Sequence, residues 1–404
     1  MLSEHHQESL YVEANEQSLT DRREMLLLQY YIRINKIPDS IVVRHMKSTS
    51  LDIRYRNTRK KPKSVAYKLR QLCEKKNINI PKITPFYQCR LGPWEIIKPK
   101  ICMELTIHGK SQTNPIAYQK YFHEHKHTAE IEIYTDGSKG ELGVGAGVLV
   151  KNGEDMEENA QKLKDIASVF TAEMLAIEIG LKILRKYNNK RCVVYSDSLS
   201  ALQAIRSANV DDKRIGVIYE TLDKLRSQEV KVEFCWIPGH SDIKGNEIAD
   251  SIAKRACILP TQDSHQEVSA SDCKAYIRKK IKDSWEQRWR QLEDNKKLKS
   301  IQESVEKKVM KLSRIDEVKL TRLRIGHTRL THSWILMGED QPMCIECDVP
   351  LTIKHILMEC GNNYLERMEY YDHREVNMKI LLNSDEYIPK VLQFLKDINM
   401  YKKI

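Results

Sequence analysis

The sequence predicts an α/β fold in its middle third, with mainly helical segments on either side. Short apolar runs typical of strands recur between residues 131 and 237, and stretches with apolar side chains at helical spacing separate them. Two strands joined by a glycine turn come first, and helices and strands then alternate. This order indicates a mixed sheet with helices on its faces.

The predicted elements of this region follow one another with short connections. The strand at 131–136 alternates apolar and polar residues, and a turn at 137–140 leads to a second strand at 143–150. A helix is predicted at 167–187. The remaining elements are a strand at 192–196, helices at 198–207 and 213–226, a strand at 230–237 and a helix at 243–257, and an earlier helix begins near Thr20 or Asp21 and stops before Pro38.

Length and composition restrict the class of protein. A chain of 404 residues suggests two or three domains at roughly 150 residues each. With 41% hydrophobic and 30% charged residues, and only 15 Gly and 12 Pro, it has packed cores and is neither collagen-like nor wholly disordered. It lacks the roughly 18 consecutive apolar residues of a membrane helix, and its acidic, polar N-terminus is unlike a secretory signal. We expect an intracellular protein, in the nucleus or cytoplasm, without membrane association, whose 10 Cys are thiols or metal ligands.

The net charge of +11 is concentrated in one part of the chain. Basic residues outnumber acidic ones by 22 to 12 in residues 1–125, whereas the counts are 19 and 21 in 126–260 and 26 and 23 in 261–404. We predict these three segments as domains, the first a basic, mainly helical connector. Its densest run, Arg54 to Lys63, has six cations in ten residues. Such a run attracts polyanions by neutralising phosphates, and a solvated loop or an import signal explains it equally well.

Three glycines, Gly143, Gly145 and Gly147, alternate along the second predicted strand. The dinucleotide-binding fingerprint instead ends a strand and opens a helix, and the chain contains no phosphate-loop motif. We therefore expect these glycines to let backbones pack closely at a sheet edge, and we do not expect a nucleotide-dependent enzyme.

Four acidic residues lie at the ends of the predicted strands or within the predicted helices. Asp136 and Asp197 each end a strand, Glu173 lies in the helix at 167–187, and Asp250 lies in the last helix. If the two strands are neighbours, their acids project from the same end of the sheet, where α/β proteins form their sites. A lone acid at a strand end is commonly a cap or turn former, but four in this order favour a metal site. Mg²⁺ takes oxygen ligands, and two such ions about 3.5–4 Å apart hydrolyse phosphodiesters.

Four blocks of sequence carry these acids: IEIYTDGSK, FTAEMLAIEIGLKIL, VVYSDSLSAL and WIPGHSDIKGNEIADSIAK. With them, residues 129–257 resemble a type 1 ribonuclease H domain. The resemblance implies a ribonuclease H-like mixed sheet of five strands with helices on both faces. It also implies a two-metal endoribonuclease that hydrolyses the RNA strand of RNA–DNA hybrids with Mg²⁺, for which Mn²⁺ is a possible substitute.

The resemblance assigns roles to individual side chains. Asp136, Glu173, Asp197 and Asp250 would bind the two metal ions, with Asp136 bridging them and Glu173 close to the 2′-OH of the scissile strand. His240 would assist proton transfer or product release, which suits an imidazole that titrates near neutral pH.

Substrate binding is expected to divide between this domain and its flanks. The RNA strand offers a 2′-OH that a protein can sense, and Gly137, Ser138 and Ser198 stand beside the metal ligands in the sequence, where they are candidate substrate contacts. Between Ser198 and Val230 there is no long insert rich in Lys, Arg and Trp of the kind that holds the DNA strand in many cellular ribonucleases H. The domain alone should therefore bind a hybrid weakly, and the basic connector should supply further nucleic-acid binding.

A Cys and His cluster lies near the C-terminus. Cys344, Cys347, His355 and Cys360 offer three thiolates and one imidazole in the pattern C-x2-C-x7-H-x4-C, a composition typical of tetrahedral zinc. The four fall within seventeen residues, whereas the other seven Cys are scattered over the chain. We predict a small zinc-binding module in the helical C-terminal region.

Sequence outside the central domain carries a second resemblance. RLRIGHTRLTH at 322–332, followed by CIEC and TIKHILMEC, is similar to the segment after ribonuclease H in jockey-like non-long-terminal-repeat retrotransposon polyproteins. The stretch 19–100 is similar to the segment that follows the reverse transcriptase in those polyproteins. No aromatic-Ala-Asp-Asp polymerase motif occurs, so we do not expect the chain to copy a template itself. It resembles the C-terminal piece of such a polyprotein, or a host gene derived from one, and a separate reverse transcriptase is a candidate partner.

Three interpretations of the function remain at this point. The first is the hybrid endoribonuclease of retrotransposon origin, and the second is a catalytically idle nucleic-acid-binding relic of a retroelement. The third, an integrase-like or Holliday-junction nuclease on the same fold, is disfavoured because the second acid lies in a helix as Thr171-Ala172-Glu173 and the His240 loop is present.

Overall fold

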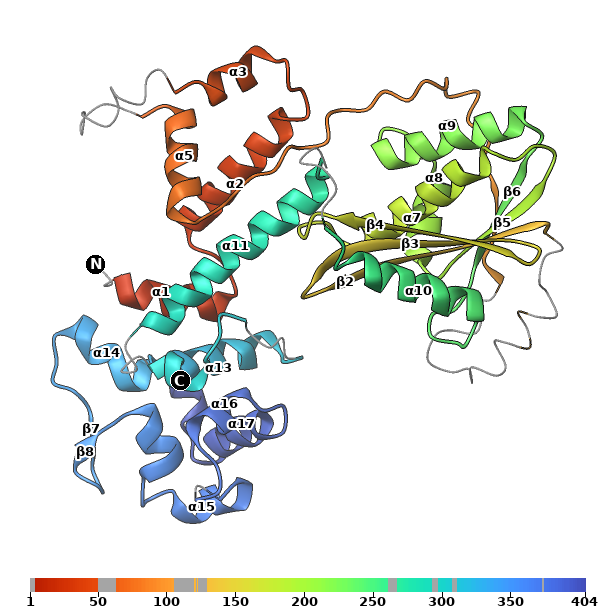
Figure 1. Cartoon of the computed structure of the whole chain (residues 1–404). Helices are drawn as coiled ribbons and strands as arrows, with labels where there is room; N and C mark the ends of the chain where they lie inside the picture. Colours follow the sequence, from red (N-terminus) through yellow and green to blue (C-terminus); the bar gives the residue numbers. More distant parts are fainter. Residues whose placement is uncertain are drawn as a thin grey trace. The chain divides into compact units, whose positions relative to one another are not determined.

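The computed structural model describes residues 4–49, 63–104, 120, 122, 129–260, 267–292, 297–306, 311–372 and 374–404. These residues divide into two compact units, Leu27–Ile277 and Met1–Leu26 with Arg278–Ile404 (Figure 1). The division cuts across the three predicted segments, since the first 26 residues group with the C-terminal region. The basic run from Arg54 to Lys63 lies outside the described residues except for Lys63.

The larger unit contains a six-stranded mixed sheet in the order β1-β6-β5-β2-β3-β4. Its antiparallel part consists of β2 (Ile131–Gly140), β3 (Gly143–Asn152) and β4 (Asp155–Leu163), and its parallel part adds β5 (Arg191–Ser196), β6 (Lys231–Trp236) and β1 (Lys100–Cys102) to β2. The prediction of five strands is wrong because the connector contributes β1. Three residues after a proline show no alternation, so this strand is defined by its partner β6 rather than by its own sequence.

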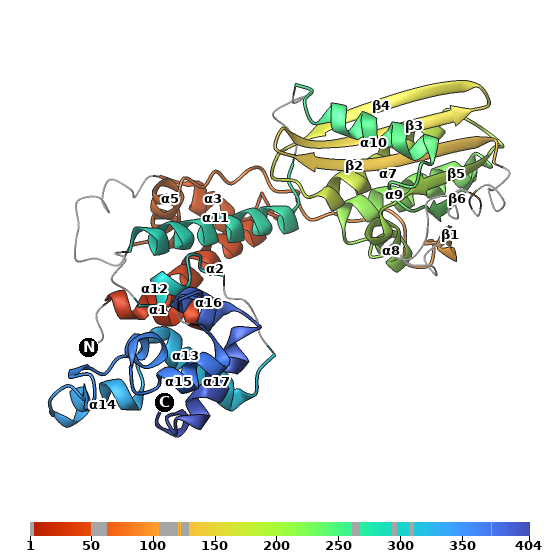
Figure 2. The same ribbon diagram turned by 90° about the horizontal axis from the view of Figure 1, so that it is seen from below.

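Helices cover both faces of the sheet, as predicted (Figure 2). On β2, Ile133 and Thr135 face α7 (Val169–Leu184), whereas Tyr134 faces the opposite side and α10 (Lys244–Ala256). This follows from the two-residue period of a strand. Next to α7 lie α8 (Leu199–Ser207) and α9 (Lys213–Ser227).

The glycines of β3 allow α10 to lie directly on the sheet. A Cβ atom at Gly147 would stand 2.4 Å from the Ala249 carbonyl oxygen, and one at Gly145 would stand 2.4 Å from that of Ala253. The close packing is as predicted but its place is not, because β3 lies between β2 and β4 and is no edge strand. These contacts hold the helix that carries Asp250.

Most of the connector belongs to the larger unit. Its helices are α2 (Leu19–Ile34), α3 (Ile41–Lys47) and α5 (Val65–Lys75). Helix α2 ends before Pro38 as predicted but begins slightly earlier than predicted, because the hydroxyl of Ser18 accepts the hydrogen bond of the Asp21 amide. The segment after α5 contacts elements of the central part of the chain. Ile83 forms a β-bridge with Val268, and the backbone amide of Arg90 donates a hydrogen bond to Glu220. This segment leads to β1.

The smaller unit is mainly helical, as predicted for the C-terminal region. Its elements are α1 (Glu4–Ala14), the C-terminal part of α11 (Ala270–Gln291), α12 (Lys297–Ile301), α13 (Arg314–Ile325), α14 (Arg329–Met337), β7 (Met343–Cys344), β8 (Val349–Pro350), η2 (His355–Glu359), α15 (Tyr364–Tyr370), α16 (Met378–Asn383), α17 (Tyr387–Asp397) and η3 (Tyr401–Lys403). A buried ion pair of 2.8 Å between Glu13 and Arg324 joins α1 to α13. Among the described helices of the chain, none has the length and apolar character needed to cross a membrane.

Candidate active site and Cys/His cluster

Three of the four predicted acids come together at the carboxyl end of the parallel strands. Asp136 on β2, Glu173 on α7 and Asp197 after β5 each offer a carboxylate oxygen within 4.8 Å of the others. Strands β2 and β5 are parallel neighbours, with Thr135 opposite Ser196, which is why both aspartates reach one edge.

Local packing fixes the backbone of these acids. Gly137 lies against the N-terminal half of α7, where a Cβ atom would stand 2.5 Å from the Glu173 amide nitrogen. The absence of a side chain therefore brings the carboxylate of the preceding Asp136 close to the helix. On the other side, the indole of Trp236 donates a hydrogen bond of 3.0 Å to the Asp197 carbonyl.

Asp250 lies near this cluster but outside the group of three. Its negative charge contributes to the raised pKa of Asp136, so the two carboxyls are close enough to interact. Its own carboxylate is 2.5 Å from the ammonium of Lys254, one helical turn further along α10. The structure thus places a lysine beside the fourth predicted ligand, a contact that the i, i+4 spacing on a predicted helix already suggests.

The acidic cluster is electrostatically unfavourable by itself. Burial, followed by the charges of Asp197 and Asp250, raises the pKa of Asp136 from 3.8 to about 7. A hydrogen bond from the Gly137 amide and the charge of Lys254 oppose this rise without cancelling it. A site that gathers carboxylates against this cost is suited to a cation.

The loop of His240 lies against one acid of the cluster, and His240 itself is exposed. A Cβ atom at Gly239 would stand 2.5 Å from a carboxylate oxygen of Asp197, so the loop backbone lies against the cluster. His240 has a positive φ of 55°, an uncommon conformation for a residue other than glycine. The exposed His240 thus directly follows a residue that lies against Asp197.

The predicted substrate contacts also lie at this edge. Gly137 is buried, and the half-buried Ser138 follows it on β2. Ser198 precedes α8 and its side chain forms no capping hydrogen bond, being 3.3 Å from the hydroxyl of Ser200. All three are therefore next to metal-ligand candidates along the chain.

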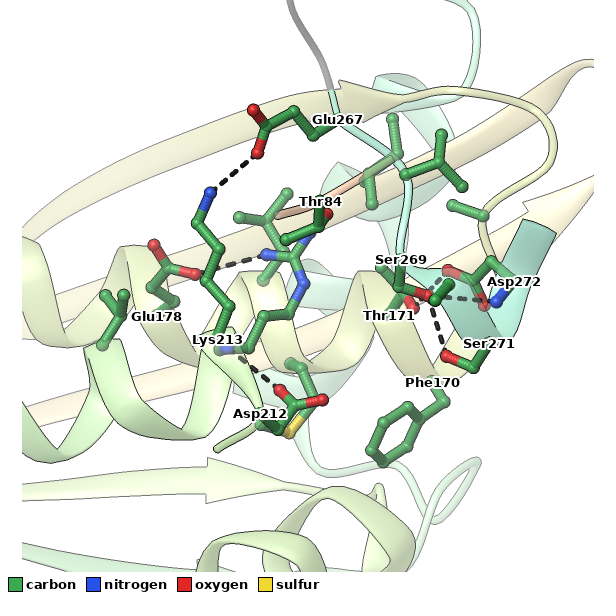
Figure 3. Close-up of a pocket in the computed structure, with 18 of the residues that line it drawn as sticks. Thr84, Phe170, Thr171, Glu178, Asp212, Lys213, Glu267, Ser269, Ser271 and Asp272 are labelled. Atoms are coloured by element: carbon green, nitrogen blue, oxygen red, sulfur yellow. Dashed lines mark hydrogen bonds and ion pairs between the residues drawn. The ribbon is translucent and has the colours of Figure 1, made fainter. Parts of the chain in front are cut away.

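A separate pocket of about 570 Å³ in the larger unit lies between α7, α9 and the segment 267–272 (Figure 3). Lys213 forms an ion pair of 2.9 Å with Glu267, and the hydroxyl of Thr171 donates a hydrogen bond of 2.7 Å to the buried Asp272. None of the four predicted acids lines this pocket. Because these polar groups pair with one another, the lining selects no particular ligand.

Comparison with known proteins identifies the central domain. Residues 128–258 match the family model described as RNase H. Ribonuclease HI of Vibrio parahaemolyticus is 28% identical over 149 residues, or 34% of this chain and 95% of that protein. Ribonuclease H of Wolbachia sp. subsp. Drosophila simulans is 28% identical over 142 residues, or 32% and 96%. The Pol polyprotein of equine infectious anemia virus is 31% identical over 128 residues, which covers 31% of this chain and 10% of the polyprotein.

The fold, the acidic cluster and these similarities define residues 128–258 as a ribonuclease H domain. The enzyme class of this domain is the type 1 RNA–DNA hybrid ribonuclease.

The second cluster lies in the smaller unit. Cys344, Cys347, His355 and Cys360 each offer a ligand atom within 4.8 Å of the others. The hairpin of β7 and β8 supplies the first two, with Asp348 in a left-handed conformation at φ 51°, and η2 supplies the His. The sequence prediction of a cluster is thus matched by the geometry.

The donor atoms of this cluster lie close enough to one another to hold a metal ion. The sulfurs of Cys344 and Cys360 are 3.9 Å apart. This separation agrees with the roughly 3.8 Å expected between two sulfurs that each lie about 2.3 Å from a tetrahedral zinc ion. The Nε2 atom of His355 is buried without a hydrogen-bond partner. Its Nδ1 atom faces Glu359 at 4.0 Å. The neighbouring imidazole of His355, aided by the amides of Cys347 and Glu346, lowers the pKa of the Cys344 thiol to about 7.

Proposed function

We propose that this chain hydrolyses the RNA strand of RNA–DNA hybrids at a site that binds two Mg²⁺ ions. The observation that carries this proposal is the cluster of three carboxylates within 4.8 Å of one another, in a ribonuclease H domain. Asp136, Glu173, Asp197 and Asp250 would hold the ions, and Mn²⁺ could replace Mg²⁺ because it accepts the same oxygen ligands.

The donor set fits the proposed cations. Its ligands are carboxylate oxygens, which hard divalent ions prefer, and the pKa of Asp136 is raised because nearby carboxylates repel one another in a buried place. When bound, the ions supply Lewis-acid chemistry that lowers the pKa of water and neutralises charge on the phosphate. Two further groups favour catalysis there: Glu173 near the N-terminus of α7, to sense the 2′-OH, and the exposed His240, to transfer a proton.

Substrate recognition would combine the domain edge with the connector. Gly137, Ser138 and Ser198 offer backbone and hydroxyl groups for the RNA strand. The described connector residues 27–49 and 63–104 contain 13 Lys or Arg against 4 Asp or Glu, a charge suited to phosphodiester backbones. We assign nucleic-acid binding mainly to this segment.

The chain is proposed to derive from a jockey-like non-long-terminal-repeat retrotransposon and to act with a separate reverse transcriptase. The sequence blocks at 322–332 and 344–360 support this origin, and similarity to part of a viral Pol polyprotein supports a reverse-transcription context. The alternative, a catalytically idle nucleic-acid-binding relic, predicts binding without cleavage.

Hybrid cleavage distinguishes the two. Purified protein with Mg²⁺ should cleave the RNA strand of a hybrid and leave double-stranded RNA intact. Asp197→Asn should reduce cleavage to background while hybrid binding is retained. Glu141→Gln, which removes an exposed acid in the β2–β3 turn, serves as the control. Binding without cleavage by the wild type would support the relic, and full activity of Asp197→Asn would refute the active-site assignment.

We also propose that Cys344, Cys347, His355 and Cys360 bind one Zn²⁺ ion with a structural role. The 3.9 Å sulfur separation and the buried, unpartnered Nε2 of His355 support this. Metal analysis should find one zinc per chain in the wild type and a large loss in Cys344→Ser. Equal zinc in the two proteins would show that the metal is bound elsewhere.

A further inference from the structure

Arg367 is a buried cation beside the Cys/His cluster. Its side chain, on α15, is only 1% exposed and is among the largest fully buried side chains of the chain. One guanidinium nitrogen, Nη2, donates a hydrogen bond of 2.7 Å to the backbone carbonyl of Cys360. The other two, Nε and Nη1, are buried without hydrogen-bond partners.

No carboxylate within 4.0 Å balances this charge in the part of the chain that the structure describes. Among the exposed charges close to the cluster, Lys354 and Glu359 form an ion pair of 2.7 Å with each other. By contrast, the other buried arginine of this unit, Arg324, is paired with Glu13. A buried guanidinium without a counter-charge is strongly unfavourable, so a missing negative charge is expected close to Arg367.

The proposed zinc site supplies such a charge. Three thiolates, one neutral imidazole and one Zn²⁺ ion sum to a net charge of −1. Cys360 is buried, and its backbone carbonyl accepts the hydrogen bond from Arg367, so the guanidinium lies next to one of the proposed zinc ligands. The backbone amide of Arg367 in turn donates to the carbonyl of Asn363 at 3.0 Å, so both the side chain and the backbone of the arginine are bound to residues 360–363.

We propose that Arg367 is the buried counter-ion of a negatively charged Cys3His zinc centre, a positioning residue whose guanidinium stabilises the thiolate-bound metal. This inference rests on the zinc site proposed above. It explains why α15 directs a cation into the interior next to Cys360 and why the guanidinium needs no carboxylate partner.

A change of ligand charge provides the test. Cys347→His converts the centre into a neutral Cys2His2 site, so Arg367→Met should then matter little. Zinc affinity is measured by competition with a chromophoric chelator in wild type, Arg367→Met, Cys347→His and the double variant, and Co²⁺ absorption verifies tetrahedral coordination. Arg374→Met, which removes an exposed arginine of the same unit, is the matched control.

Arg367→Met should weaken zinc binding at least about tenfold in the Cys3His centre, as outer-shell substitutions commonly do, and less than about threefold in the Cys2His2 centre. If Arg367→Met folds only in the Cys347→His background, the result also supports the role of Arg367 as the counter-ion. Equal losses in both backgrounds, failure to fold in both, or an equal effect of Arg374→Met would overturn it. A wild-type protein without zinc would refute the zinc site itself, which the metal analysis decides separately.

Discussion

Replacing Asp136 by Asn should stabilise the metal-free larger unit at neutral and alkaline pH. Asp136 is 7% exposed, and burial together with the charges of Asp197 and Asp250 raises its pKa to about 7. The folded state therefore binds this proton more tightly than the unfolded state does. Below the pKa that Asp136 has in the unfolded state, the group is protonated in both states and does not affect the free energy of unfolding. This free energy declines as the pH rises through the pKa of Asp136 in the folded state.

The size of the effect follows from the shift. A rise from 3.8 to about 7 corresponds to an upper bound of about 4 kcal/mol in the free energy of unfolding. Asn is nearly isosteric and cannot ionise, so Asp136→Asn should gain roughly 2 to 4 kcal/mol over the wild type above pH 8 and little near pH 4.

Hydrogen exchange of β2 peptides in EDTA, at several pH values, measures the stability of this unit. Glu141→Gln should show no comparable dependence, because that side chain is exposed. Adding Mg²⁺ should stabilise the wild type more than Asp136→Asn, since ligands stabilise the state that binds them. A gain that does not grow with pH would refute the electrostatic argument.

Two further predictions concern the packing of the units. Gly147→Ala should destabilise the larger unit by roughly 1 to 3 kcal/mol, because its Cβ would stand 2.4 Å from backbone atoms of α10. Hydrogen exchange of β2 peptides measures this effect, and Gly140→Ala, with open space around the new Cβ, is the control. Glu13→Ala should destabilise the smaller unit by roughly 3 to 5 kcal/mol, because it leaves a buried arginine unpaired. Exchange of α13 peptides measures this, with the exposed Glu16→Ala as control, and equal protection in both variants would contradict it.

The convergence of Asp136, Glu173 and Asp197 could be predicted from the sequence because local patterns determine it. Each acid follows or interrupts a clear strand or helix, and parallel strands bring their carboxyl ends together. The position of Asp250 near Asp136 depends instead on how α10 lies on β3, where glycines allow close contact. The exposure of His240 likewise depends on a loop conformation that its sequence pattern does not specify.

Elements defined by distant partners could not be predicted. Residues 155–163, DMEENAQKL, form β4 although they are mostly exposed and lack apolar alternation, because pairing with β3 determines their conformation. The partnership of Glu13 with Arg324 spans most of the chain, so no local pattern indicates it. Arg367 resembles any helical arginine until its burial is known.

The strand β1 has a practical consequence for dissecting this protein. A fragment cut at the boundaries of the family match, 128–258, would lack Lys100–Cys102 and leave the hydrogen-bonding groups of Glu233–Cys235 on β6 exposed. Open strand edges promote association between molecules. In this chain the preceding segment supplies β1, the strand that covers the edge of β6. The smallest soluble fragment is therefore expected to begin upstream of residue 128.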